Sequence, residues 1–403
     1  MRDIVEIGIG REARRSYRLS DIQIIPSRRT RSSKDVDTSW HIDAYTFDNP
    51  FISHPTDALA TPEFIIEMGR QGGLGVINAE GLWGRQRDLG GAVGRVREAI
   101  NAELSGPEFY GSEATRVLQE LHAAPIDEEL LTARIAEVRA SGTTVAVRVT
   151  PQHARELAPV VIGAGAELLF IQGTMISAEH VATGGEPLNL KEFIGSLDVP
   201  VIAGGVADYT TALHLMRTGA AGVIVGGGAN TNDVALGIGC PMATAIADAA
   251  AARRDYLDET GGRYVHIIAD GEIESSGDAV TAMACGADGV ILGHPLAKAR
   301  EAAAQGAYWS HSAAHPRFPR GTVEPAWTDV AFSADLLGSG DGDTVDTVGN
   351  TPTLETVLHG PSTDPHGMLN YVGGLRRAMA KCGYTDLKSF QKVQLSVAGG
   401  VGF

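Results

Sequence analysis

The chain has 403 residues, 43% of them hydrophobic, which is enough to fill the core of one large α/β domain. Its 33 basic and 49 acidic residues give a net charge of −16, which disfavours binding to nucleic acid or to an anionic membrane surface. No apolar stretch is long enough to span a bilayer and the first residues hold no apolar signal core, so we expect a cytoplasmic protein.

Short apolar runs alternate with amphipathic helical segments along the chain. In chain order, strands are predicted at Pro50–Ser53, Leu74–Asn78, Thr144–Thr150, Glu167–Gln172, Pro200–Gly204, Gly222–Val225, His266–Asp270 and Gly289–Gly293. Glycines at 165, 219 and 286 are expected to cap the helices that precede three of these strands. Eight βα units are typical of a closed barrel, whereas an open sheet usually has about five or six strands. The predicted fold class is therefore α/β, a (β/α)8 TIM barrel.

Several segments lie outside the eight repeats. An extension precedes the first barrel strand, and residues 82–141 are expected to form a helical insertion between the second and third strands. Residues 305–350 form a long, flap-like insertion after strand eight, of a length that is usually functional or disordered. Residues 351–403 add a helix near 367–381 and a tail. We expect residues 1–403 to form a single TIM-barrel domain.

The unit from Ile267 to Gly293, IIADGEIESSGDAVTAMACGADGVILG, is the most informative stretch. It is one strand, loop, helix and strand, and its polar residues come just after the strands end. The carboxyl ends of parallel strands are where α/β enzymes place their chemistry. Asp270 and Gly271 are therefore candidate site residues.

Motifs along most of the chain resemble those of the IMP dehydrogenase/GMP reductase family. They are SYRLSDIQIIPSRRT, SHPTDALATPEF, GGLGVIN, VIAGGVAD, LGIGCPMATAIAD, IIADGEIESSGD, VILGHPLA and NYVGGLRRAM, and their order is more specific than any one of them. The likeness is to the IMP dehydrogenase-related branch without CBS domains, because the gap after the second strand is too short for such a pair.

This resemblance implies a purine-nucleotide site over the barrel mouth. In the family a loop cysteine attacks IMP at C2, hydride passes to NAD, and an Arg-Tyr pair on a flap activates water to release XMP. GMP reductases use a similar thiol with NADPH. Family members commonly assemble as homotetramers, so a homo-oligomer is expected.

The nucleophile position departs from the family pattern. Asn230 stands where the attacking cysteine belongs, and the loop before it, 226–229, is about three residues short. An amide has no thiolate form and is a poor nucleophile. Cys240, beside a proline that looks like the first residue of a helix, is either a substitute nucleophile or a packing residue. The other two cysteines, Cys285 and Cys382, are interpreted as core residues, and no disulfide or metal site is expected.

The phosphate and ribose positions are partly retained. Gly271 and Gly293 match the family, but Glu272 replaces a glycine and His294 replaces a serine. A carboxylate at Glu272 would oppose a phosphate unless it points away or His294 compensates. By resemblance Asp270 accepts the ribose hydroxyls; the alternative is that it caps the following turn or helix.

The cofactor side is also altered. By resemblance, weak NAD contacts fall to Asp57, Gln172 and Gly205, but the family has aspartate and asparagine at the last two positions. The flap has no adjacent Arg-Tyr pair. It offers Tyr308, Trp309, Arg317, Arg320 and Trp327.

Three hypotheses follow. The first is a catalytically degenerate barrel that keeps a ligand, which would be a purine mononucleotide or an active dehydrogenase subunit. The second is an active NAD(P)-dependent oxidoreductase, either an IMP dehydrogenase or a GMP reductase, that uses Cys240 or His294. The third is a barrel whose ligand the family likeness does not identify, because fold alone never fixes function.

Overall fold

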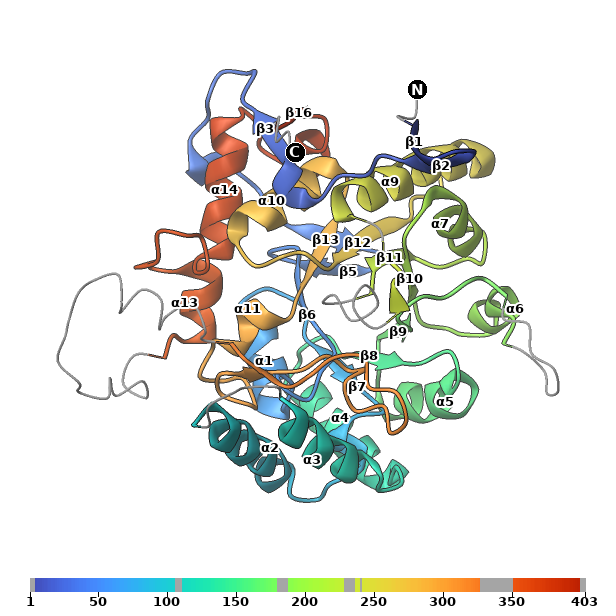
Figure 1. The fold of residues 1–403 in the computed structure, drawn as a ribbon, viewed down its shortest axis with the longest axis vertical. Helices are drawn as coiled ribbons and strands as arrows, with labels where there is room; N and C mark the ends of the chain where they lie inside the picture. Colours follow the sequence, from blue (N-terminus) through green and yellow to red (C-terminus); the bar gives the residue numbers. More distant parts are fainter. Residues whose placement is uncertain are drawn as a thin grey trace.

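The computed structural model describes residues 4–105, 111–179, 188–227, 236–239, 241–326 and 351–398. Its centre is an eight-stranded parallel sheet in the order β6-β13-β12-β11-β10-β9-β8-β7 (Figure 1). A parallel bridge between Ile52 in β6 and Leu74, two residues before β7, joins the two edges of the sheet, so the sheet is nearly closed into a barrel. The barrel strands are β6 (Phe51–Ser53), β7 (Val76–Asn78), β8 (Ala146–Val149), β9 (Leu168–Gln172), β10 (Val201–Val206), β11 (Gly222–Gly226), β12 (His266–Asp270) and β13 (Gly289–Leu292).

Helices surround this barrel, as the alternating pattern predicts. Those that follow barrel strands are α1 (Pro62–Arg70), α4 (Glu128–Ala140), α5 (Ala154–Ala164), α6 (Leu190–Gly195), α7 (Tyr209–Met216), α9 (Met242–Thr260), α10 (Ser276–Cys285) and α11 (His294–Ala297). The predicted 82–141 insertion adds α2 (Leu89–Leu104) and α3 (Ser112–His122) ahead of α4. The C-terminal part adds α13 (Leu354–His359), α14 (Tyr371–Lys381) and α15 (Leu387–Phe390). Of these, α13 and α14 lie along one side of the barrel (Figure 1).

Three predicted helix boundaries were wrong by a few residues. Gly219 is not a C-cap, because α7 ends at Met216 and Gly219 lies beyond the cap with φ +98°. Pro241 is the N-cap residue of α9 and not its first helical residue. The helix expected near 367–381 begins at Tyr371, because the side chain of Asn370 accepts the backbone N–H of Gly373 and starts the helix there.

The barrel interior is a separate apolar core. Ile52, Phe170, Ile224 and Ile268 are among its fully buried members. A hairpin formed by β4 (Trp40–Ile42) and β5 (Tyr45–Phe47) contributes Trp40 to the same core. The Trp40 indole also donates to His266 Nδ1 at the first residue of β12, so the hairpin packs at the amino-terminal end of the strands. A ligand must therefore enter at the other end, where the strands finish.

Further short strands, which were not predicted from the sequence, pair outside the barrel near both ends of the described chain. The hairpin of β1 (Ile4–Gly8) and β2 (Arg11–Arg14) is joined to α9 by an ion pair between Arg14 and Asp248 (Figure 1). At the other end, β16 (Gln394–Val397) pairs antiparallel with β3 (Ile22–Ile25). Within the predicted flap, β14 (Ala307–Tyr308) pairs antiparallel with β15 (Glu324–Pro325).

Candidate functional site

One inward-facing layer of residues closes the carboxyl end of the barrel. Side chains alternate across a strand, so the residue two positions after each interior apolar residue also faces inward. We call this set the mouth layer; it consists of His54, Asn78, Arg148, Gln172, Gly204, Gly226, Asp270 and Gly293. The half of the mouth layer that follows β6 to β9 consists of polar side chains. In the other half, which follows β10 to β13, Asp270 is the only residue of the layer that is not glycine.

Asp270 and Gln172 contact one another across this mouth. Gln172 Nε2 donates to Asp270 Oδ2 at 2.7 Å, although two strands separate β9 from β12 in the barrel. Both side chains are buried. Burial raises the pKa of Asp270 to about 7, and the bond from Gln172 only partly offsets this. The residue expected to hold ribose and a residue expected to hold cofactor are therefore hydrogen-bonded to each other.

Asp270 is not the cap of the next helix, which was the alternative to a ligand role. The N-terminus of α10 is closed by a capping box, in which Ser275 accepts the backbone N–H of Asp278 and the Asp278 carboxylate accepts that of Ser275. The carboxylate of Asp270 therefore does not cap α10 and faces the mouth layer, where it contacts Gln172.

The predicted phosphate cradle lies beside a tyrosine from the flap. A Cβ added to Gly293 would lie 2.4 Å from the Tyr308 hydroxyl, so that ring packs directly over the glycine. The ring of His294 meets Tyr308 edge-on, with their centroids 5.7 Å apart. Tyr308 is itself buried, which raises the pKa of its hydroxyl well above 10. A phosphate reaching Gly293 would have to share this space with a neutral hydroxyl.

Two carboxylates, those of Glu274 and Glu324, act on His294 at the predicted phosphate cradle. His294 Nδ1 lies 3.3 Å from Glu274 Oε2, and burial raises the pKa of the neighbouring Glu324. Burial alone would lower the pKa of His294, but the two carboxylates raise it above its ordinary value. A protonated His294 would therefore pair mainly with Glu274, which leaves less of its positive charge for a phosphate. Glu272, at φ +57°, turns its carboxylate to the backbone N–H of Leu19, which it accepts at 3.2 Å.

A buried chain of polar rings borders the mouth on the side of β6. The Tyr308 hydroxyl lies 3.2 Å from His54 Nδ1, and His54 Nε2 lies 3.3 Å from His311 Nδ1. Burial, followed by the charge of Arg148, lowers the pKa of His54 to about 3 and that of His311 well below 6.5. Both imidazoles are therefore neutral. His54 and His311 were not predicted from the sequence. The signal for His54 was its position two residues after Ile52, which faces the barrel interior.

Arg148 was also missed, although the same alternation along β8 places it inside the barrel. It is 3% exposed, and its guanidinium donates to Asn78 Oδ1 at 3.1 Å and to the carbonyl of Gln172 at 2.8 Å. Both acceptors are neutral. A buried arginine at this position gives the β6 to β9 half of the mouth a positive charge.

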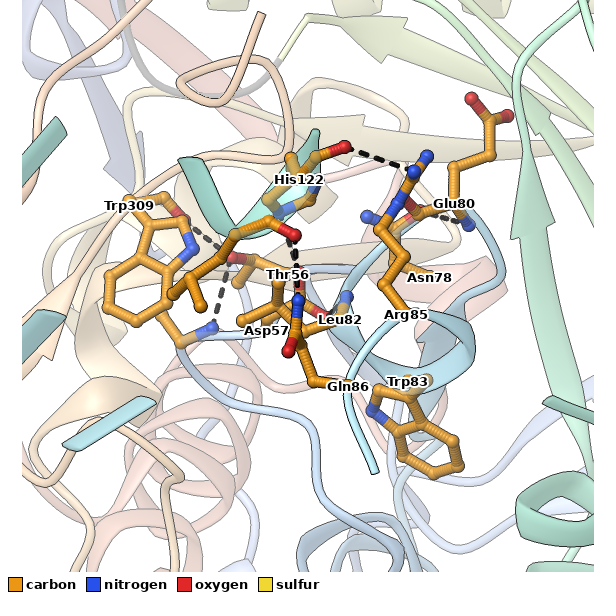
Figure 2. Close-up of polar contacts among 12 residues, drawn as sticks. Thr56, Asp57, Asn78, Glu80, Leu82, Trp83, Arg85, Gln86, His122 and Trp309 are labelled. Atoms are coloured by element: carbon orange, nitrogen blue, oxygen red, sulfur yellow. Dashed lines mark hydrogen bonds and ion pairs between the residues drawn. The ribbon is translucent and has the colours of Figure 1, made fainter. Parts of the chain in front are cut away.

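Asp57 lies in a separate network below Thr56 (Figure 2). Its Oδ1 accepts the backbone N–H of Leu82 at 2.9 Å, and its Oδ2 lies 3.4 Å from His122 Nε2. Thr56 Oγ1 donates to the carbonyl of Trp309 and so ties the flap to the loop after β6 (Figure 2). Both Asp57 oxygens thus have protein partners, which supports a role in fixing the loop.

Gly205 has no room for the asparagine of the family. A Cβ added there would lie 1.7 Å from the carbonyl oxygen of Gly226, so the backbones of β10 and β11 meet where a side chain would begin. The glycine is required by this close approach.

The two cysteines that the structure describes, Cys285 and Cys382, pack at the ends of helices. Burial raises the pKa of Cys285 to about 11 and also raises that of the buried Cys382. Neither is a thiolate near neutral pH. Asn230, Cys240 and Trp327 lie outside the described residues.

Within the described ranges, no group of three or more histidine, cysteine, aspartate or glutamate side chains is arranged to hold a metal ion. No helix among those same residues combines the length and the apolar character that a membrane span needs.

Comparisons with known proteins agree with this barrel and its motifs. The family model described as IMP dehydrogenase / GMP reductase domain matches residues 16–400. A crystal structure of an IMP dehydrogenase/GMP reductase-like protein from Corynebacterium glutamicum superposes with a TM-score of 0.88 at 66% identity and covers 98% of each chain.

Curated relatives match over most of the chain. An uncharacterized oxidoreductase of Mycobacterium tuberculosis is 59% identical over 400 residues, covering 98% of this chain and all of that protein. An inosine-5'-monophosphate dehydrogenase of Korarchaeum cryptofilum is 25% identical over 364 residues, covering 71% of this chain and 75% of that protein. The chain therefore belongs to the IMP dehydrogenase/GMP reductase family.

Proposed function

We propose that this chain is a catalytically degenerate IMP dehydrogenase-related barrel that retains weak purine-mononucleotide binding. The observation that carries the proposal is the bond between Gln172 and Asp270. A working site needs one of these residues for the ribose and the other for the cofactor. Here Gln172 Nε2 instead donates to Asp270 Oδ2, and the family's cysteine is replaced by Asn230.

The residues present do not fit the NAD that the family implies. Gln172 is bonded to Asp270, Gly205 has no space for a side chain, and both carboxylate oxygens of Asp57 are engaged. The buried guanidinium of Arg148 would also repel the cationic nicotinamide ring of NAD. These residues therefore do not form an NAD site.

The charge around the cradle supports weak rather than tight nucleotide binding. The carboxylate of Glu274 is 3.3 Å from His294 and takes up most of the positive charge that a phosphate would use. The Glu272 carboxylate accepts the backbone N–H of Leu19. It therefore points away from the cradle and does not directly oppose a phosphate there, as the sequence alone suggested it would. A mononucleotide would then be held chiefly by Asp270 and by backbone N–H groups at Gly271 and Gly293.

One observation favours the alternative of an active oxidoreductase. Asp270 is a buried carboxyl with a pKa of about 7, and a group with such a pKa can both give and take a proton at neutral pH. The relatives at 59% identity are also named as oxidoreductases. An active enzyme would need a nucleophile outside the described residues, for which Cys240 is the candidate.

Nucleotide binding is tested by titrating IMP, XMP and GMP against melting temperature. We expect a small, saturable rise in Tm for wild type that Asp270→Ala abolishes, since a ligand that binds only the folded state stabilises it. Asp43→Asn, an exposed substitution with the same change in charge, serves as the control. The same rise in wild type and Asp270→Ala, or none in wild type at millimolar nucleotide, would contradict the proposed site.

A further inference from the structure

An open groove of about 380 Å³ lies on the surface where β3, α10 and α14 meet (Figure 1). Its walls include Ser276 and Thr281 of α10, Gly374 and Ala378 of α14, and Gln23 and Ile24 of β3. None of these residues belongs to the mouth layer, so the groove is a different surface from the proposed nucleotide site.

One edge of β3 faces this groove. Successive side chains of a strand point to opposite faces, so a groove lined by both Gln23 and Ile24 runs along the strand edge. The strand β16 covers the other edge, where Ala398 donates its backbone N–H to the carbonyl of Asp21. Because bonded and unbonded pairs alternate along an antiparallel ladder, Gln23 and Ile25 bond to β16, and the N–H and C=O of Ile24 point away from it.

The outer edge of β3 is therefore open to a further strand. In the part of the chain that the structure describes, β3 pairs with β16 alone. An unpaired strand edge beside a groove is the geometry in which an extended peptide adds to a sheet, with its backbone bonded to the edge and its side chains in the groove.

Basic residues gather at one end of the groove. Residues 26–34, which follow β3, and the helix α14 together hold seven basic residues and no acidic one, in a chain whose net charge is −16. The two segments are in contact, because Arg31 donates its backbone N–H to the carbonyl of Ala380. The Arg28 guanidinium also lies over the ring of Tyr384, just after α14.

Two of these basic residues border the groove itself. Arg377 and Lys381 come three residues after Gly374 and Ala378, so all four lie on one face of α14. Both basic side chains are exposed, and among the described residues no ion pair joins either of them to a carboxylate. Their charges are available to an acidic partner.

We propose that an acidic, extended segment of a partner protein binds in this groove as a strand added beside β3, with its carboxylates at Arg377 and Lys381. The N–H and C=O of Ile24 match a peptide backbone, whereas a nucleic acid backbone offers only acceptors to such an edge. The net charge of −16 also repels a long polymer of phosphates. This interaction goes beyond the proposed nucleotide binding and does not depend on it.

A fluorescein-labelled peptide of alternating glutamate and valine is the probe, and its fluorescence anisotropy measures binding. We expect saturable binding that the double substitution Arg377→Gln and Lys381→Gln weakens about tenfold or more, because two charged contacts are lost. Arg87→Gln with Arg95→Gln removes the same charge from exposed arginines elsewhere and should leave binding unchanged. Equal binding by the two double variants, or no saturable binding to wild type, would overturn the proposal.

The backbone contact is tested with two further peptides, N-methylated either at the glutamates or at the valines. Both keep every carboxylate, and one of them should bind about tenfold more weakly, because alternate N–H groups of a strand point to the same edge. The unmodified peptide should also slow hydrogen exchange at the N–H of Ile24. Equal affinity of all three peptides would show charge attraction without an added strand, and would contradict the proposal.

The oligomeric state separates a partner protein from a second copy of this chain. The Arg377→Gln and Lys381→Gln variant should sediment as wild type does, because the groove is proposed to bind another protein. Assembly that this variant abolishes would assign the groove to a second copy instead, and would contradict the proposal.

Discussion

Replacing Asp270 by asparagine should change how stability depends on pH. Burial raises the pKa of this carboxyl from 3.8 to about 7 in the folded protein. Its contribution to stability is therefore fully present below pH 3.8 and is lost as the pH rises through about 7. The difference between the two pKa values corresponds to about 4 kcal/mol. Asparagine keeps an oxygen for the Gln172 donor but carries no charge.

The assay is urea unfolding of wild type and Asp270→Asn at a series of pH values from 4 to 8. The free energy of unfolding of the variant, relative to wild type, should increase by up to about 4 kcal/mol across this range. Asp43→Asn, at an exposed turn, should show no comparable trend. A difference that stays constant with pH to within about 1 kcal/mol would refute a desolvated carboxyl at the mouth.

Gln172→Leu provides an independent check on the same pair. The bond from Gln172 lowers the pKa of Asp270, so removing it should raise that pKa further. The loss of stability should then continue to higher pH than in wild type. An unchanged profile would show that the two side chains do not interact in solution.

Two other substitutions and one labelling experiment test buried groups of the barrel. Gly205→Asn, which restores the family residue, should destabilise the protein by about 2 kcal/mol or more in urea unfolding, because its Cβ would clash with the carbonyl of Gly226; a neutral effect would contradict the close approach of β10 and β11. Arg253→Met should cost about 3–5 kcal/mol, because it leaves Asp288 buried without its ion-pair partner; a loss below about 1 kcal/mol would refute this. Cys285 should react with a disulfide reagent slowly at pH 7.5, since burial raises its pKa to about 11, and rapid labelling at that position would contradict its burial.

The sequence was sufficient to predict the barrel, because repeated strand and helix patterns record local structure. All eight strands lie where expected, and glycines 165 and 286 do cap their helices. Boundaries shifted where a cap decides them, as at Asn370.

The site was predicted less completely, because its contacts join residues far apart in the chain. Asp270 was found from its place at a strand end, but its partner Gln172 is 98 residues away. The hydrogen bonds of Arg148 and the covering position of Tyr308 depend on which residues face inward and on how the flap folds back. Counting two residues on from each interior apolar residue would have identified Arg148 and His54 from the sequence.

Catalytic degeneracy is tested most directly by following NADH formation with IMP and NAD, using protein purified free of the host dehydrogenase. With Asn230 in place of the thiol and Gln172 bonded to Asp270, we predict no turnover above the rate of a blank. Turnover on the order of 1 s⁻¹ would contradict the account.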